Sequence, residues 1–357
     1  MLFDENYIKN LLPKRPQDSH KGTFGHVLNI AGSGFYSGAA YFSSMAPLKV
    51  GAGRVTLAST ETVLRAVAAM TPDVILLPLD ETKEKTASPC SIKTIETKIN
   101  DYNAISIGCG LSVDKNTINF FEKLMKSLEN SKIPVVIDAD GLNILSKIHS
   151  KLQSKPDLDL QSRLGLPTQQ RKTGYTLNET RDNFKLPKNT ILTPHPLELS
   201  RLLGVEVETI LAEPELWAKK CCEKYDCTTV LKIHKTIVAG TELQSKHPEI
   251  DVVGLSNPTY FANQGQALIA TQDEKKGRVY INNTGNTALS KGGSGDVLCG
   301  MIAGFLAQGL NTFEASVLGV YLHGKTAEIA SKDLTEYSVL ASELLNYIHL
   351  AIKELIN

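Results

Sequence analysis

A glycine-rich segment near the carboxyl end of the chain carries the residues best suited to chemistry. Gly292, Gly293 and Gly295 let the backbone approach a ligand closely, because they have no Cβ. The apolar pattern that follows predicts a buried helix, and the free N–H groups and positive dipole at its start favour an anion. Asp296 stands at this junction, where its carboxylate can accept a proton from a substrate hydroxyl. The alternative is a simple helix cap, but the glycines and Ser294 around Asp296 favour a site.

Other polar residues follow predicted strands. His195 lies between two prolines, which hold the backbone extended. Asp138 and Asp140 follow a short apolar run, and residues 232–236 supply two cations, an imidazole and a hydroxyl. Ligands of α/β proteins bind where the carboxyl ends of strands meet, so we expect a site there. The two aspartates suit Mg²⁺, directly or through water, with an Asp-Gly turn as the alternative, and residues 232–236 suit nucleotide phosphates.

Residues 32–38 form a second glycine loop between a predicted strand and a predicted helix. This pattern is similar to a dinucleotide fingerprint, which also needs an acidic residue at the end of the next strand. The predicted strand 54–59 has no such residue, since Glu61 comes only after Thr60. We therefore predict a loop that lines a substrate pocket rather than a dehydrogenase fingerprint.

Alternating strands and helices must position these residues. Near-continuous apolar strands separated by amphipathic helices indicate a parallel sheet that is covered on both faces. We expect strands at 27–31, 54–59, 104–108, 134–138, 190–193, 229–232 and 236–239, and helices near 39–50, 117–128, 196–203 and 215–224.

Two polar segments, 150–186 and 244–276, lack this periodicity. They predict insertions into a single α/β domain that spans residues 1–357. Solvated loops without a catalytic role are the simpler interpretation, and a lid over the site is the alternative.

Composition excludes several classes of protein. The chain has 357 residues, of which 42% are hydrophobic and 21% charged, as is typical of a globular protein. Its 38 basic and 38 acidic residues balance, so we expect neither a nucleic-acid nor a membrane partner. The chain starts without a signal-peptide pattern, and no apolar run approaches the ~18 residues of a membrane helix. The six cysteines lack paired spacing and predict reduced thiols in a cytoplasmic protein.

Five segments, in this order along the chain, resemble the motifs of one family. They are residues 20–40, 135–143, 193–204, 230–236 and 282–304. Together they are similar to the NAD(P)H-hydrate dehydratases of the ribokinase-like superfamily. The resemblance implies a three-layer α/β/α sandwich with a central, mostly parallel sheet. It also implies dehydration of the S epimer of hydrated NADH or NADPH, with Mg²⁺ and with ADP, or ATP, as the phosphate donor.

The resemblance also assigns roles to individual residues. Asp296 is the implied catalytic base, acting while residues 292–295 hold the phosphoryl group, and it also contacts the substrate. The other implied substrate contacts are Gly38, Ala39, Ala40, Gly110 and His195. The implied nucleotide contacts are Lys232, Ile233, His234, Lys235, Thr236, Asn286, Gly292, Gly293, Ser294 and Gly295.

This chain departs from the family pattern at three positions. The family usually has glycine where Leu197 and Ile233 stand, and proline where Cys109 stands. A β-branched residue resists conformations that glycine adopts easily, so Ile233 bears on how the nucleotide is held.

Two other functions remain open. One is a kinase of a small hydroxymethyl compound on the same scaffold, against which His195 and residues 20–40 argue. The other is a non-catalytic nucleotide-binding protein, against which Asp296 argues. Residues 193–196 and 291–296 resemble the bacterial and archaeal branch, which predicts ADP as the donor, and the family resemblance implies a homo-oligomer, a tetramer.

Overall fold

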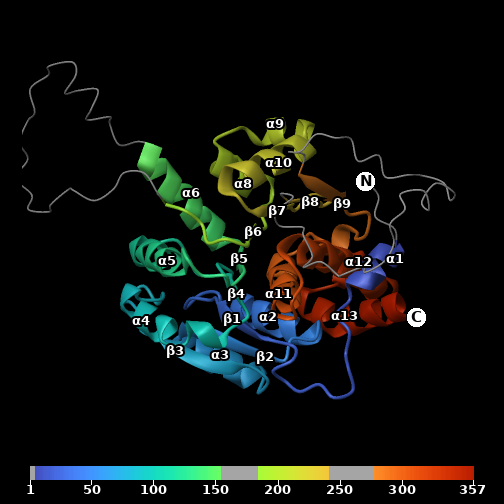
Figure 1. Ribbon diagram of the computed structural model, residues 1–357, viewed down its shortest axis with the longest axis horizontal. Helices are drawn as coiled ribbons and strands as arrows, with labels where there is room; N and C mark the ends of the chain where they lie inside the picture. The colour runs from blue at the N-terminus through green and yellow to red at the C-terminus, as the bar shows by residue number, and fades with distance from the viewer. Residues whose placement is uncertain (1–4, 154–183, 241–276) are drawn as a thin grey trace, which may run out of the picture.

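The computed structural model describes residues 5–153, 184–240 and 277–357. Their strands are β1 (His26–Ile30), β2 (Arg54–Thr60), β3 (Ile75–Leu79), β4 (Ala104–Ile107), β5 (Val135–Ile137), β6 (Thr190–Leu192), β7 (Thr228–Leu231), β8 (Ile237–Gly240) and β9 (Arg278–Ile281). They form one sheet in the order β3-β2-β1-β4-β5-β6-β7-β8-β9 (Figure 1). The pairs from β3 to β7 are parallel, and β8 pairs antiparallel with β7 and β9. The sheet is therefore mostly parallel, as predicted.

Helices cover both faces of this sheet because successive strand residues point in opposite directions. Val27 packs into one core and Leu28 into the other. The first core is closed by α1 (Glu5–Leu11), α2 (Ser37–Lys49), α3 (Glu61–Met70), α11 (Ser294–Ala307), α12 (Thr312–Ser338) and α13 (Ala341–Ile356). The second is closed by α4 (Ile92–Glu96), α5 (Lys115–Leu128), α6 (Asp140–Gln153), α8 (Pro196–Leu203), α9 (Val207–Ala212) and α10 (Pro214–Tyr225).

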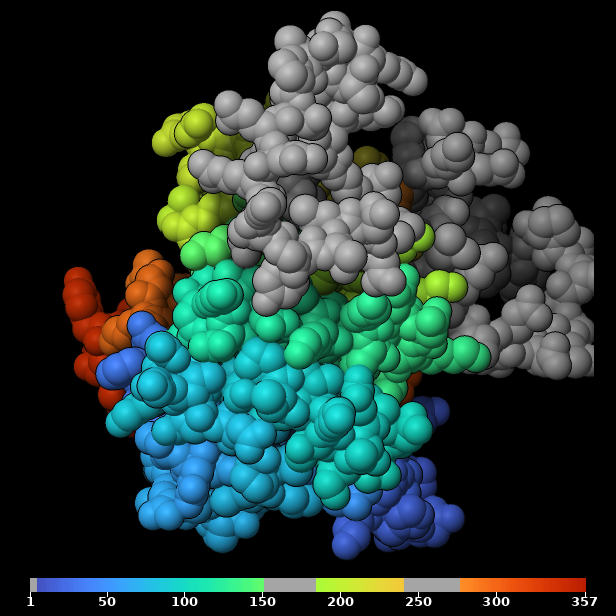
Figure 2. All heavy atoms as spheres, turned by 90° about the vertical axis from the view of Figure 1, so that its left-hand side faces the viewer, coloured from blue at the N-terminus to red at the C-terminus, as the bar shows by residue number. Residues whose placement is uncertain are grey.

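The result is a three-layer α/β/α sandwich, as the sequence predicted. Figure 2 shows the molecule from the side of α4, α5 and α6, whose side chains form a continuous surface there. Short 3₁₀ turns, η1 (Pro89–Ser91), η2 (Ile99–Asp101) and η4 (Thr287–Leu289), complete the described elements. None of the helices in the described residues is both long and apolar enough to span a bilayer.

The sequence prediction placed the seven inner strands within one or two residues but missed β3 and β9, the two edges of the sheet. Both edge strands are partly exposed. β3 is apolar in sequence, but it contains Pro78, which argues against a strand and which an edge strand tolerates because it lacks a neighbour on one side. β9 is short and begins with the exposed Arg278. The long helix α12 and the final helix α13 were not predicted either.

The ends of the predicted insertion at 150–186 belong to packed structure. Helix α6 continues to Gln153, and the Phe184 ring stacks on Phe121 with 6.5 Å between ring centroids. The ring of His149 meets Phe184 edge-on at 6.3 Å. Residues 154–183 and all of the predicted insertion at 244–276 lie outside the described residues.

Because the Phe184 ring packs against α5 and α6, its removal should destabilise the fold. We expect Phe184→Ala to lower the free energy of unfolding by about 2 kcal/mol, through lost ring contacts and a partly filled cavity. Denaturant unfolding measures this. Phe35→Ala is the matched control, since Phe35 is 79% exposed and should change stability little. Equal stability of the two variants would contradict the packing role of Phe184.

Candidate functional site

The carboxyl ends of neighbouring parallel strands bring several predicted residues together. Asp138 follows β5 and Lys232 follows β7. Lys232 Nζ donates to Asp138 Oδ1 at 2.5 Å and lies 4.0 Å from Glu198 Oε2. The Asp138 side chain is only 2% exposed, so this ion pair is largely removed from water. The pair joins the ends of two strands that are separated in the sheet by β6.

Asp296 reaches this group from α11. The helix begins at Ser294, two residues before the predicted start, with Gly293 at the N-cap in a left-handed conformation (φ 91°). Asp296 therefore lies in the first turn and is not the cap residue, and no side chain caps this end. A Cβ added to Gly295, in the same turn, would lie 3.5 Å from Lys232 Nζ and 3.7 Å from Asp138 Oδ2. The first turn of α11 thus packs against the ion pair.

The Asp296 carboxyl is held in an environment that favours its protonated form. Burial raises the pKa of Asp296 to about 6, and the nearby Asp138 carboxylate adds to the rise. A hydrogen bond from Cys109 and the charge of Lys232 act in the opposite direction. At neutral pH the group is mostly ionised yet still basic, which suits a general base.

Two further carboxyl groups line the same region. Burial raises the pKa of Glu198 to about 7, a rise that the charge of Lys232 limits. Burial also raises the pKa of Asp140, whose Oδ2 accepts from the Ser112 N–H at 2.8 Å. For Lys232, burial alone would lower the pKa, but the Asp138 and Glu198 carboxylates raise it overall. Lys232 therefore stays charged.

This set of carboxylates fits a divalent cation such as Mg²⁺. Asp138 and Asp140 follow β5. The charge of Asp138 raises the pKa of Asp140, and the charges of both raise the pKa of Asp296. Mg²⁺ takes oxygen ligands and usually keeps several waters. Asp138 Oδ1 is occupied by Lys232 and by the Ala139 N–H, so Asp138 Oδ2 and Asp140 are the oxygens that would hold the ion.

His195 follows β6 and caps the start of α8. Its Nδ1 accepts from the N–H groups of Leu197 and Glu198 at the start of α8, at 3.1 and 3.3 Å. The Glu198 carboxylate in turn accepts from the His195 N–H at 2.8 Å. Burial and then Lys232 lower the pKa of His195, so the ring is neutral at pH 7 with its proton on Nε2. The exposed Nε2–H remains 3.5 Å from Glu198 Oε1 and is the atom that can meet a substrate.

The predicted substrate loop lies beside Gly110. Gly38 and Ala39 are in the first turn of α2, and both are partly exposed, whereas Ala40 is fully buried. Gly110 has φ 63°, and a Cβ there would lie 2.6 Å from Tyr36 Cβ and 2.9 Å from Ala39 Cβ. The structure therefore brings Gly38, Ala39 and Gly110 together, while the Ala40 side chain packs inward.

Residues 232–236 connect the antiparallel strands β7 and β8. Ile233 is absent from the residues with positive φ, so this turn does not need the glycine that the family usually has. The hydroxyl of Thr236 donates to the Ile233 carbonyl at 3.1 Å and closes the turn. The side chains of His234 and Lys235 are exposed at its tip, away from the buried Asp138–Lys232 pair.

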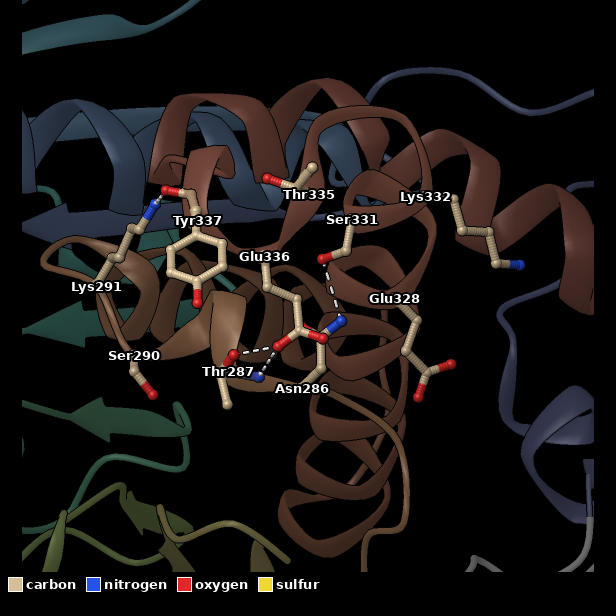
Figure 3. A pocket seen from close by; sticks show the side chains of 10 residues that line it. All are labelled: Asn286, Thr287, Ser290, Lys291, Glu328, Ser331, Lys332, Thr335, Glu336 and Tyr337. Atoms are coloured by element: carbon tan, nitrogen blue, oxygen red, sulfur yellow. Dashed lines mark hydrogen bonds between the residues drawn. The ribbon is translucent and has the colours of Figure 1, made fainter.

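Asn286 lines a cavity of about 950 Å³ next to the glycine loop (Figure 3). Its Nδ2 donates to Ser331 Oγ at 3.1 Å, and Thr287 is hydrogen-bonded to Glu336. Figure 3 shows these contacts joining η4 to α12 across the cavity wall. None of the carboxylates near Asp296 lines this cavity. Asn286 therefore lies apart from the cluster around Lys232. Residues 287–293 link it along the chain to the start of α11. The full lining is Asn286, Thr287, Ser290, Lys291, Glu328, Ser331, Lys332, Thr335, Glu336 and Tyr337.

A buried histidine contacts the first residue of α11. Ser294 Oγ lies 3.3 Å from His323 Nε2, which comes from α12. Burial lowers the pKa of His323 to about 4, so the ring is neutral. At Gly293 a Cβ would lie 2.8 Å from Phe42 and from Ala341. At Gly292 none of the described atoms is within 4 Å, so the loop is tightly packed on one side and open on the other.

The sequence interpretation missed three residues of this region: Glu198, Cys109 and Cys299. Glu198 stands three residues after His195, the spacing of a capping box, and this signal was available. The Cys109 thiol is close enough to Cys299 and Asp296 to influence the pKa of both groups. Nothing in their spacing links these two cysteines, because the fold alone brings β4 and α11 together.

Comparison with known proteins agrees with this architecture. The model of the NAD(P)H-hydrate dehydratase family matches residues 27–158 and 259–350. The ADP-dependent (S)-NAD(P)H-hydrate dehydratase of Neisseria meningitidis is 32% identical over 330 residues, which cover 92% of this chain and 85% of that protein. The chain spans about half the length of other relatives, such as 54% of the bifunctional NAD(P)H-hydrate repair enzyme of Moorella thermoacetica.

Solved structures share the fold. The ADP/ATP-dependent NAD(P)H-hydrate dehydratase of Bacillus subtilis, co-crystallised with ATP and Mg²⁺, is 24% identical with a TM-score of 0.67, over 99% of this chain and 98% of that one. A ribokinase-like superfamily protein of Enterococcus faecalis is 22% identical with a TM-score of 0.70, over 99% and 95%. With the family match to more than half of its residues, this chain belongs to the NAD(P)H-hydrate dehydratase family.

Proposed function

We propose that this protein dehydrates the S epimer of hydrated NADH or NADPH, with ADP as the phosphate donor, and releases AMP and phosphate. The observation that carries the proposal is Asp296, a carboxylate with a pKa of about 6 in the first turn of α11, beside Lys232. It is a base next to an anion site, which is what phosphoryl transfer to a hydroxyl requires. The names of the relatives support this choice of substrate and donor.

The reaction has two stages. The ring hydroxyl oxygen forms a bond to the terminal phosphorus of ADP, the bridging P–O bond breaks to leave AMP, and Asp296 accepts the hydroxyl proton. The C–O bond to the new phosphate then breaks as the ring nitrogen donates its electron pair. Loss of a proton from the adjacent ring carbon to phosphate restores the dihydronicotinamide. Phosphate is a far better leaving group than hydroxide, so the first stage makes the second possible.

Groups of this chain would stabilise the phosphoryl group during its transfer. The free N–H groups at the start of α11 and the Lys232 ammonium supply positive charge where the phosphate oxygens would lie. Mg²⁺, when bound by Asp138 Oδ2 and Asp140, neutralises further phosphate charge. His195 Nε2–H, with Gly38, Ala39 and Gly110, would contact the hydrated nucleotide. Residues 233–236 and Asn286 would contact the adenine nucleotide, with its nucleoside part toward the cavity at η4.

The family resemblance also leads us to propose a tetrameric homo-oligomer that acts in the cytoplasm as a single domain with two insertions. The even charge balance is compatible with these proposals, and so is the finding that none of the helices in the described part of the chain could span a bilayer. A kinase of a small hydroxymethyl compound would leave a stable phosphorylated product, whereas the dehydratase restores the absorbance of the reduced nicotinamide. One assay on hydrated NADH therefore separates the two functions.

The first test changes the base. Asp296→Asn keeps the shape of the side chain but cannot accept the proton, so we expect turnover of hydrated NADH with ADP to fall by ~10²–10⁴-fold. Affinity for ADP should stay within a few-fold, because the ion pair at Lys232 and the N–H groups of α11 remain. The measurement is recovery of absorbance at the reduced-nicotinamide band.

A pH profile gives a second measurement of the same group. As pH falls through about 6 the Asp296 carboxyl gains a proton, so kcat/KM of the wild type should decline below that pH. The residual activity of Asp296→Asn should lack this decline. If the variant keeps more than about half of wild-type activity, Asp296 is not the base.

Gly295→Ala tests where the phosphoryl group lies. The added Cβ would meet Lys232 and Asp138 at ordinary contact distances, and alanine favours a helix over glycine by up to ~1 kcal/mol. We therefore expect an unchanged or higher Tm but a loss of kcat/KM for ADP on the order of 10²-fold, because the methyl group occupies the phosphate position.

Gly300→Ala is the contrasting variant in the same helix. Its Cβ would lie 2.6 Å from the Ser43 carbonyl oxygen, so it should lower Tm through α2 packing. Full activity of Gly295→Ala would place the phosphoryl group elsewhere.

The donor should be ADP rather than ATP. The β-phosphate would lie on the start of α11, which leaves no room for a third phosphate between it and the ring hydroxyl. The non-glycine turn at Ile233 has ordinary backbone angles and does not disturb this arrangement. Steady-state rates with enzymatically cleaned ADP and ATP measure the preference. A larger kcat/KM for ATP would overturn the donor assignment and leave the dehydratase proposal intact.

A further inference from the structure

Two buried cysteines lie beside the Asp138–Lys232 ion pair. The sulfurs of Cys109 and Cys299 and a carboxylate oxygen of Asp138 are all within 4.8 Å of one another, and all three residues are buried. Across residues 5–153, 184–240 and 277–357, no other three His, Cys, Asp or Glu side chains gather so closely. Asp296 is close enough to Cys109 for the thiol to lower its pKa, but its carboxylate is not one of the three groups that gather so closely.

We propose that Cys109, Cys299 and Asp138 form a binding site for a thiophilic divalent metal of the Zn²⁺ class, and that a metal bound there inhibits the enzyme. The inhibition rests on the function proposed above, whereas the binding does not. Thiolate ligands select Zn²⁺ and similar ions over Mg²⁺. Two sulfurs and one carboxylate oxygen supply three ligands for zinc, and a water molecule can complete the tetrahedral set.

The distances allow this site with little movement. Zn–S bonds are about 2.3 Å and Zn–O bonds about 2.0 Å, so ligand atoms around a tetrahedral zinc are about 3.5 Å apart. The three atoms that lie within 4.8 Å would close by about 1.3 Å at most. Cys109 follows β4, Asp138 follows β5 and Cys299 is in α11, so the ligands come from three rigid elements.

The charge of the cluster also permits a cation despite the ammonium of Lys232. Before binding, Cys109 and Cys299 are thiols. The contact with Cys299 and then burial raise the pKa of Cys109. The contact with Cys109 lowers the pKa of Cys299, but burial and the nearby carboxylates outweigh it and raise that pKa overall. On binding, each S–H bond breaks, each sulfur keeps the electron pair and bonds to the metal, and two protons leave to solvent. One dication therefore replaces two protons, and the net charge beside Lys232 does not change.

A metal in this position would block the reaction at its first step. Asp296 responds to the charges of Asp138 and Lys232, so a dication bound at Asp138 would lower its pKa and make it a weaker base. The metal would also share Asp138 with the site proposed for Mg²⁺. Inhibition should therefore follow occupancy of the thiolate site and be reversed by a chelator.

The binding test uses the full chain after chelator treatment, without nucleotide, titrated with Co²⁺ and then Zn²⁺ at a pH of about 8. We expect one Co²⁺ per chain with a thiolate-to-cobalt charge-transfer band, two protons released per metal, and displacement by Zn²⁺. Cys299→Ala should weaken binding at least ~100-fold and remove the band. Cys221→Ala is the matched control, because Cys221 and Cys299 are both fully buried, and it should bind like the wild type.

Cys109→Ser, which preserves volume, gives the same test if Cys299→Ala does not fold. The site is overturned if no thiolate band appears, or if the band survives both site variants and is lost in Cys221→Ala. Zn²⁺ should inhibit hydrate turnover by the wild type and Cys221→Ala, but not the remaining activity of Cys299→Ala. Full activity of the Zn²⁺-loaded protein would overturn the inhibition. A chain that shows the thiolate band but never turns over hydrate would instead overturn the proposed function.

Discussion

The ion pair between Lys232 and Asp138 is the interaction on which the candidate site depends. Four carboxyl groups, those of Asp138, Asp140, Glu198 and Asp296, meet where strand ends and α11 converge. Without a cation among them, mutual repulsion would drive protons onto several of these groups. Removing one partner of such a buried pair typically costs 3–5 kcal/mol. Lys232 therefore lets the carboxylates stay close together, and it also offers positive charge to a phosphate.

Close helix packing fixes the first turn of α11 against this pair. Gly300 and Gly304 allow α11 to touch α2, since a Cβ at either position would lie 2.6 Å from α2 or the residue that follows it. A buried polar network anchors α2 in turn. Asn29 of β1 donates to the hydroxyls of Ser43 and Ser44 and accepts from Ser106 of β4. These contacts fix α11, and with it Asp296, relative to the sheet. A side chain on a loop would be held less rigidly.

Much of this arrangement could be predicted from the sequence because the inner strands are buried on both faces. Each reads as an apolar run, and the polar residues that follow it, such as Asp138, His195 and Lys232, mark the edge at which ligands bind. The edge strand β9 lacks that signal because it is short and partly polar, whereas β3 is apolar but is interrupted by Pro78, which argues against a strand. The true start of α11 was missed because Gly295 reads as loop, although its backbone is helical. The cysteine pair was missed because 190 residues of chain separate Cys109 from Cys299, so only the packing of α11 on β4 brings them together.

Cys109 shows how a departure from the family pattern can adjust the site. Burial raises the pKa of Asp296, and the Cys109 hydrogen bond partly opposes that rise. Proline, which the family usually has at this position, carries no side-chain donor, so it could not act on Asp296 in this way. The thiol keeps its proton, because the contact with Cys299 and then burial raise the pKa of Cys109 well above its usual range. The same sulfur that makes Asp296 a more acidic carboxyl is thus also the group through which a thiophilic metal could act on it.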